Sequence, residues 1–221
     1  MKNKQKRKER CTCGTLFDWD KFICMEKEKI GKFYKQFFNR DIDWSKVNIN
    51  SNVSTMKYFK LFRPEYIFSD IKADEVVDTY SKQFGGNSIF VSSEKYDGRI
   101  CSNIKSQQER PKKDYVVFHK GEIVPDLLGW SYQDGIDQRI DFMVVVEGII
   151  SEFRFRVETG EVYDNYENAT CFSTIDRLGS PMAMKWVRGY SHLGIFEGNQ
   201  YDKDFGLRRV FYEKPYPLCN L

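Results

Sequence analysis

The sequence contains little histidine and no long apolar run. Only His119 and His192 occur among the 221 residues, which disfavours a metal site built from several histidines. No apolar stretch approaches the roughly 18 residues that a spanning helix needs, so no membrane span is expected. The basic N-terminus lacks the apolar segment of a secretory signal, which predicts a cytoplasmic chain. Its 6 cysteines are then expected to be reduced.

Sequence signatures of catalysis are also missing. There is no Gly-x-Ser-x-Gly elbow, no glycine-rich phosphate loop with its lysine and no dinucleotide fingerprint. Cys11 and Cys13 are separated by one residue rather than two, and no second cysteine pair follows as in a zinc knuckle. We therefore expect no metal and no cofactor, and a plain loop at these two cysteines.

The composition is that of a globular domain rich in aromatic residues. Apolar residues make up 41% of the chain and charged residues 30%, so it can bury a core. Aromatic residues make up 16%, with 18 Phe and 13 Tyr. Such a composition suits sheet packing and often leaves aromatic surface for a partner.

Positive charge is concentrated at the N-terminus. The formal net charge is +3, yet the first residues carry one acid, Glu9, against these bases: Lys2, Lys4, Lys6, Arg7, Lys8 and Arg10. The rest of the chain is therefore slightly acidic. We predict a basic, flexible tail over residues 1–14 and a single α+β domain over 15–221. The tail is suited to contact nucleic acid or another anion, or it serves only to keep the chain soluble.

Two segments have helical periodicity. Apolar residues recur at helical spacing over about 18–38 and alternate with charged residues, which predicts an amphipathic helix. A second helix is predicted over about 73–84, closed by Gly85 and Gly86. Short strands are predicted at 88–93, 114–119, 182–187, 193–196 and 207–212. Another is predicted at 56–62, ended by Pro64.

The stretch from 139 to 166 has the clearest strand pattern. Residues 142–146 form a continuous apolar run, typical of a strand buried on both faces. From Glu152 to Glu158 apolar and charged residues alternate strictly, as in a strand with one buried face. Gly160 then suits a hairpin turn with positive φ. The predicted fold is α+β, a largely antiparallel sheet with a meander around 140–166, packed with the two helices.

Four short segments carry a resemblance to a family of enzymes. Residues 94–98 contain Lys-x-Asp-Gly, and they are followed by Phe-His-Lys-Gly-Glu at 118–122, Glu-Gly-Ile-Ile at 147–150 and Met-Lys-Trp-Val-Arg at 184–188. This order resembles the motifs of ATP-dependent DNA ligases, RNA ligases and mRNA capping enzymes. The resemblance implies a covalent nucleotidyltransferase whose catalytic residues are Lys95, Glu122, Glu147 and Lys185. Lys95 would attack a nucleotide α-phosphate, Glu147 would bind metal and ribose, and Lys185 would hold phosphate.

The same lysine segment also fits a simple hairpin. Asp97-Gly98 between strand-forming residues favours a two-residue turn, with Lys95 exposed beside it. Arg99 follows Gly98 directly, whereas the family has one residue between them, and Ser151 stands where the family has a basic residue. We favour the hairpin. The leading functional hypothesis is a non-enzymatic binding or assembly protein with an aromatic-rich sheet surface and the basic tail. A protein is its expected partner, and nucleic acid is a second candidate through the tail.

Overall fold

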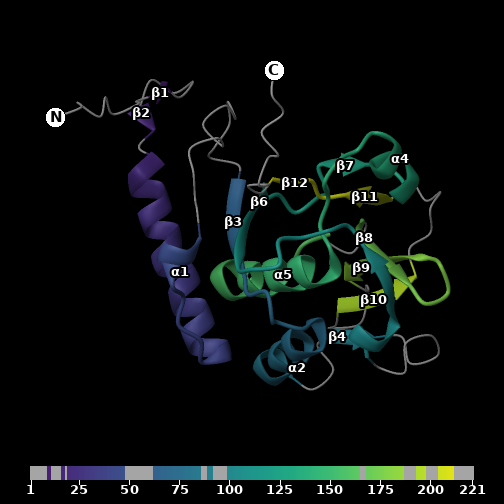
Figure 1. Ribbon diagram of the computed structural model, residues 1–221, viewed down its shortest axis with the longest axis horizontal. Helices are drawn as coiled ribbons and strands as arrows, with labels where there is room; N and C mark the ends of the chain where they lie inside the picture. Colours follow the sequence, from purple (N-terminus) through teal and green to yellow (C-terminus); the bar gives the residue numbers. More distant parts are fainter. Residues whose placement is uncertain are drawn as a thin grey trace. The chain divides into compact units, whose positions relative to one another are not determined.

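The computed structural model divides the chain into two compact units, residues 1–42 and 43–221, which are treated separately below (Figure 1). The residues that it describes are 9–10, 16–17, 19–47, 62–85, 89–91, 99–164, 168–186, 193–197 and 204–211. Helices occur in it together with parallel and antiparallel strand pairs, so the predicted α+β class is confirmed. A single domain over 15–221 stays a prediction.

The first unit contains the predicted amphipathic helix. Strands β1 (Glu9–Arg10) and β2 (Leu16–Phe17) pair antiparallel, and α1 (Trp19–Phe38) follows. The bounds of α1 confirm the prediction of a helix over about 18–38. The rings of Phe33 and Phe37 lie one turn apart with centroids at 5.3 Å, as helical spacing requires.

The second unit contains all the other elements that the structure describes. In chain order they are η1 (Trp44–Lys46), β3 (Phe62–Ile67), α2 (Ala73–Phe84), β4 (Ile89–Val91), η4 (Cys101–Asn103), β5 (Ile104–Gln107), β6 (Tyr115–Lys120), β7 (Leu127–Leu128), α4 (Tyr132–Asp137), α5 (Val145–Thr159), β8 (Ala169–Asp176), β9 (Pro181–Trp186), β10 (Leu193–Glu197), β11 (Phe205–Leu207) and β12 (Val210–Phe211). Helix α2 has the predicted bounds. Strands β4, β6, β9, β10 and β11 fall within or beside segments predicted as strands.

Two sheets form the second unit. The larger has the order β4-β10-β9-β8-β11-β7, with β5 also paired to β8, and the smaller has the order β12-β6-β3 (Figure 1). The pairs β10–β4 and β11–β8 are parallel, and the other pairs are antiparallel. The prediction of a largely antiparallel sheet is therefore confirmed. Its central strand, β8, was not predicted.

The predicted meander around 140–166 is wrong, because most of this stretch is helix α5. Helix α5 contacts α2 and strands of both sheets, and it lies at the centre of the second unit (Figure 1). The alternation from Glu152 to Glu158 suggested one dry and one wet face. In the helix Glu152 and Arg154 are both buried, as are Phe153 and Phe155. A helix buried nearly all round produces no helical periodicity, so a short alternation was misleading.

Hydrogen bonds that involve the backbone cap both ends of α5. At the start, a Glu147 Oε2 atom accepts a hydrogen bond from the backbone N–H of Val144 at 2.9 Å. At the end, Gly160 has φ 76° and donates its N–H to the Arg156 carbonyl at 2.9 Å. The positive φ of Gly160 was predicted, but it caps a helix and does not turn a hairpin.

Strand β3 also differs from its prediction, because Pro64 lies inside it. Residues 56–61 lie outside the described residues, and β3 runs from 62 to 67 as the edge of the smaller sheet. An edge strand accommodates proline, which has no N–H to donate. The Pro64 carbonyl accepts a hydrogen bond from Arg154 Nη1 of α5 at 2.5 Å. Helix α5 thus holds this strand through a buried arginine.

Close packing joins α5 to the larger sheet. A Cβ atom built on Gly148 would lie 2.2 Å from a ring carbon of Phe172 in β8, so a glycine is needed there. One core cluster collects Phe142, Cys171, Phe205 and neighbouring side chains of β8, β9 and β11. The close approach of Gly148 to Phe172 holds α5 against the sheet and thereby positions the polar side chains of the helix.

Candidate functional site

Polar side chains of α5 form the most unusual chemical feature of the second unit. Helix α2 and strands of both sheets contact this helix (Figure 1). Ser151, Arg154 and Glu158 follow one helical stripe, toward β3 and β6, while Glu152 and Arg156 follow another, toward α2 and β9. Buried polar groups are stable only when they are paired, so each stripe must find partners.

The first stripe forms an ion-pair cluster with β3, which we call the Glu65 cluster. Arg154 Nη1 lies 3.0 Å from a Glu65 carboxylate oxygen, and its Nε lies 2.6 Å from Glu158. Arg63 lies 3.4 Å from Glu65 and 3.1 Å from Glu158. Burial opposes the charge of Glu65, but the positive charges of Arg154 and Arg63 outweigh it and lower the pKa of Glu65 to about 2. Glu65 is therefore ionised in the folded protein.

Next to this cluster, His119 and Ser151 are in direct hydrogen-bond contact. His119 Nδ1 lies 2.8 Å from the Lys120 carbonyl, which can only accept, so we assign the ring proton to Nδ1. His119 Nε2 then accepts from the Ser151 hydroxyl at 2.8 Å, and the Tyr163 hydroxyl lies 3.4 Å from the same serine. Burial lowers the pKa of His119 despite the nearby Glu65, so the imidazole is neutral.

This serine and histidine have the contact of a nucleophile and its general base. Ser151, His119 and Tyr163 are nevertheless all buried, with at most 1% of each residue exposed. In this conformation no substrate reaches the serine. The pair instead joins β6 to α5. His119 is a hydrogen-bonded histidine of the core, and His192 lies outside the described residues.

The second stripe holds a buried carboxyl group without a close cation. Glu152 accepts hydrogen bonds from the Tyr163 backbone N–H at 2.8 Å, the Trp186 indole at 3.0 Å and the Tyr80 hydroxyl at 3.3 Å. Burial raises its pKa to about 8, because these neutral donors only partly replace the lost hydration. Glu152 thus connects α2, β9 and the segment after α5 at one point.

Arg156 lies one turn further along α5, against aromatic rings. Its guanidinium carbon lies 4.0 Å from the ring centre of Phe84, 4.8 Å from that of Trp186 and 5.6 Å from that of Tyr80. Its Nη1 donates to the Tyr80 hydroxyl at 2.9 Å. Tyr80 and Trp186 are buried, whereas Arg156 and Phe84 are half-buried, so only the outer part of this group reaches the surface. We call these four residues the Arg156 cluster.

The residues predicted by resemblance lie in different environments. Glu147 is fully buried, and its carboxylate accepts from Arg110 at 2.6 and 3.1 Å, Tyr115 at 2.9 Å and the Val144 N–H. With both oxygens engaged, Glu147 has no room for a metal ion in this conformation. Glu122 is half exposed, 3.6 Å from Lys120, and Lys185 is partly buried on β9.

Other predicted residues lie mostly outside the described part of the chain. These are Lys95, Cys11, Cys13, Lys2, Lys4, Lys6, Arg7 and Lys8. Arg10 lies in β1. Within the described residues, no group of three or more His, Cys, Asp or Glu side chains is arranged to hold a metal ion. The described helices include none that is long and apolar enough to cross a bilayer.

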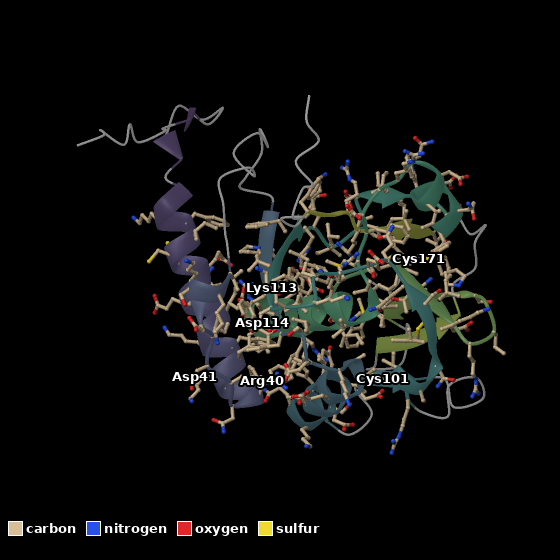
Figure 2. All side chains as sticks on the ribbon, in the orientation of Figure 1. Arg40, Asp41, Cys101, Lys113, Asp114 and Cys171 are labelled. Carbon is tan, nitrogen blue, oxygen red and sulfur yellow. The ribbon has the colours of Figure 1, made fainter. Side chains whose placement is uncertain are left out.

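Two of the described thiols are poorly suited to nucleophilic chemistry. Burial raises the pKa of Cys171 to about 12 and also raises the pKa of Cys101 (both labelled in Figure 2). A reactive cysteine instead needs a lowered pKa and access to solvent.

Sequence patterns alone did not predict the long-range contacts that form both clusters. The available signal was the i, i+4 spacing of the pairs Arg154–Glu158 and Glu152–Arg156, which is useful only once the stretch is read as a helix. No family model, curated protein or solved structure matches the chain. The functional assignment therefore rests on the residues and their geometry.

Proposed function

We propose that this chain is a non-enzymatic binding protein that engages a protein partner through a surface group of aromatic and arginine side chains, with the basic N-terminal residues adding electrostatic attraction. The observation that carries the proposal is the Arg156 cluster. Trp, Tyr and Arg are the residues that most often dominate binding energy at protein interfaces. Here they lie together, and Arg156 and Phe84 are partly exposed.

The contrast with the Ser151–His119 pair supports the same proposal. The polar groups of α5 that resemble catalytic machinery are enclosed and bonded to one another, whereas Arg156 and Phe84 of the Arg156 cluster are partly exposed. An aromatic-rich sheet surface was expected, but side-chain burial limits how much aromatic surface is exposed. Among the side chains that the structure describes, every aromatic ring is buried or half-buried, so the aromatic contribution comes from a compact cluster.

Site-specific photo-crosslinking tests the proposed function. A photoreactive residue replaces Gln83, an exposed neighbour of Phe84 on α2, in the full chain incubated with an extract of its source cells. We expect a discrete covalent adduct of defined mass. The matched control places the same residue at Leu178, which is exposed in the turn between β8 and β9. Equal adducts at both positions, or none at 83, contradict the proposal.

Deleting residues 2–10 tests the contribution of the tail. We expect weaker capture of the same partner and a flatter dependence of affinity on salt, because fewer counterions are released. An unchanged salt slope contradicts a role for the tail.

Incubation with labelled ATP or GTP and magnesium tests the enzymatic alternative. A covalent label that is lost in Lys95→Ala would replace the binding proposal with a nucleotidyltransferase.

A further inference from the structure

We propose that Tyr80, Phe84 and Trp186 form a recognition site for an arginine side chain of the protein partner, and that Arg156 occupies this site when the partner is absent. The inference rests on the proposed function and names the chemistry that the Arg156 cluster recognises. The three rings come from α2 and β9, and their centres all lie within ~6 Å of the Arg156 guanidinium carbon, the range in which a cation interacts with an aromatic face.

A fixed polar floor supports these rings. Glu152 accepts hydrogen bonds from the hydroxyl of Tyr80 and the indole of Trp186, which holds both rings in position. The Tyr80 oxygen then remains available as an acceptor, and Arg156 Nη1 uses it at 2.9 Å. The site is thus built independently of Arg156, since Glu152 and the packing of Phe153 against Tyr80 and Phe84 orient it.

The contacts of Arg156 are weak compared with those of Arg154. Arg154 is buried and bound to Glu65, Glu158 and the Pro64 carbonyl. Arg156 is half-buried and donates one hydrogen bond to Tyr80, and none of the described carboxylates forms an ion pair with it. Contacts with aromatic faces at partly exposed sites are individually modest. Arg156 can therefore leave the rings without breaking a buried ion pair.

The geometry selects a guanidinium over a quaternary ammonium ion. The guanidinium carbon lies only 4.0 Å above the Phe84 ring, a separation typical of a planar group stacked on a ring. The bond to the Tyr80 hydroxyl also requires an N–H donor, which a quaternary ammonium lacks. The partner therefore presents an arginine. Arg156 competes with the partner's arginine for the rings. The apparent affinity of the protein for that arginine is therefore reduced in proportion to the fraction of molecules in which Arg156 has left the rings.

Binding of N-acetyl-arginine amide tests the site directly. The readout is the indole N–H resonance of Trp186 in a ¹H–¹⁵N spectrum, assigned by its loss in Trp186→Phe. In Arg156→Gln we expect a saturable shift of this resonance at about tenfold lower probe concentration than in the unmodified chain, since the internal competitor is gone. Arg156→Ala provides a second variant with the same expectation. Arg99→Ala, which removes an exposed arginine elsewhere, should leave the affinity unchanged.

The neutral probe N-acetyl-citrulline amide provides the chemical control. It has nearly the same shape without the charge, and no saturable shift is expected from it. The inference is overturned if the citrulline probe shifts the Trp186 resonance as much as the arginine probe does. It is also overturned if Arg156→Gln is folded but its Trp186 resonance does not respond to the arginine probe. If the photoreactive residue at position 83 forms its adduct but the arginine probe does not bind, the proposed binding function stands and the proposed guanidinium site is wrong. If the arginine probe binds but no adduct forms at position 83, the proposed function is contradicted.

Discussion

Two fully buried glutamates lie on opposite sides of α5, and they have opposite electrostatic properties. Glu65 of β3 lies against Arg154 and Arg63, and its pKa is lowered to about 2. Glu152 of α5 accepts hydrogen bonds from neutral donors, and burial raises its pKa to about 8. Burial is complete at both positions, so burial alone does not determine the charge.

The difference lies in what replaces water around each carboxylate. At Glu65 two guanidinium groups supply opposite charge, which offsets the desolvation penalty. At Glu152 dipoles of N–H and O–H groups offset it only in part. The first region is therefore a charged structural brace between β3 and α5. The second is a less strongly held junction beside the partly exposed Arg156 cluster, which is where we place the function.

The largest expected effect comes from removing the cation of the brace. In Arg154→Met the Glu65 carboxylate stays buried with weaker compensation, and we expect the free energy of unfolding to fall by about 3–5 kcal/mol. Urea denaturation at pH 7 measures it. Arg156→Met is the matched control on the same helix and should lose about 1 kcal/mol, because it removes ring contacts and one hydrogen bond. Equal losses of stability in Arg154→Met and Arg156→Met would contradict the proposed difference between the two regions.

The second largest effect is expected from acid, which should reduce the stability that the ionised Glu65 contributes. The pKa of Glu65 in the folded chain is about 2, against an ordinary value of 4.5, so the unfolded chain binds more protons between these two values. Stability from this group is complete above pH 4.5 and is lost as the pH falls toward 2, by about 3 kcal/mol. Denaturation from pH 6 to 2 measures the slope. Glu65→Gln should show a clearly flatter slope, and an identical slope contradicts the assignment.

Glu152 should show the opposite dependence over a higher pH range. Its folded pKa of about 8 lies above the ordinary 4.5, so the folded chain binds more protons in that window. Stability is greatest below pH 4.5 and decreases by several kcal/mol as the pH rises to 8. Glu152→Gln should remove this decline, whatever its baseline stability. If stability still declines with rising pH in Glu152→Gln, another titrating group causes the decline.

The smallest effect is expected at the Ser151–His119 contact. Ser151→Ala removes the hydroxyl that donates to His119 Nε2, and a buried acceptor without its donor costs about 1–2 kcal/mol. Thermal or urea unfolding at pH 7 measures the loss. Ser106→Ala, at an exposed position of β5, should change stability by less than about 0.5 kcal/mol. A neutral result at Ser151 would show that the contact does not stabilise the fold.

Local sequence patterns predicted both amphipathic helices and several strands. Helices α1 and α2 were predicted with nearly correct bounds because charged residues interrupt their apolar stripes at helical spacing. Strands β6 and β9 are buried almost throughout, but they were recognised from short β-branched or alternating runs. Strand β8 was missed, although its burial is similar to theirs.

Residues of the clusters were not recognised for a related reason. Arg154 and Glu152 look like solvent-exposed charges in a sequence, because charged residues are rarely buried without a partner. Their partners, Glu65 and Trp186, are 89 and 34 positions away in the chain. Glu147 was singled out for metal chemistry, yet Arg110, a residue 37 positions away, occupies its carboxylate. Such long-range pairs have no local signature.

The sequence by itself determined the α+β class, the amphipathic helices, the positive φ of Gly160 and the concentration of basic charge at the N-terminus, since these follow from local periodicity, sterics and composition. Only the tertiary structure decided that residues 145–159 form a central helix. Burial on all sides removes the helical pattern, and Phe172 against Gly148 and Arg154 against Glu65 stabilise the helix in its place. It also decided which carboxylate is charged, because distant chain segments supply the neighbouring cations or dipoles.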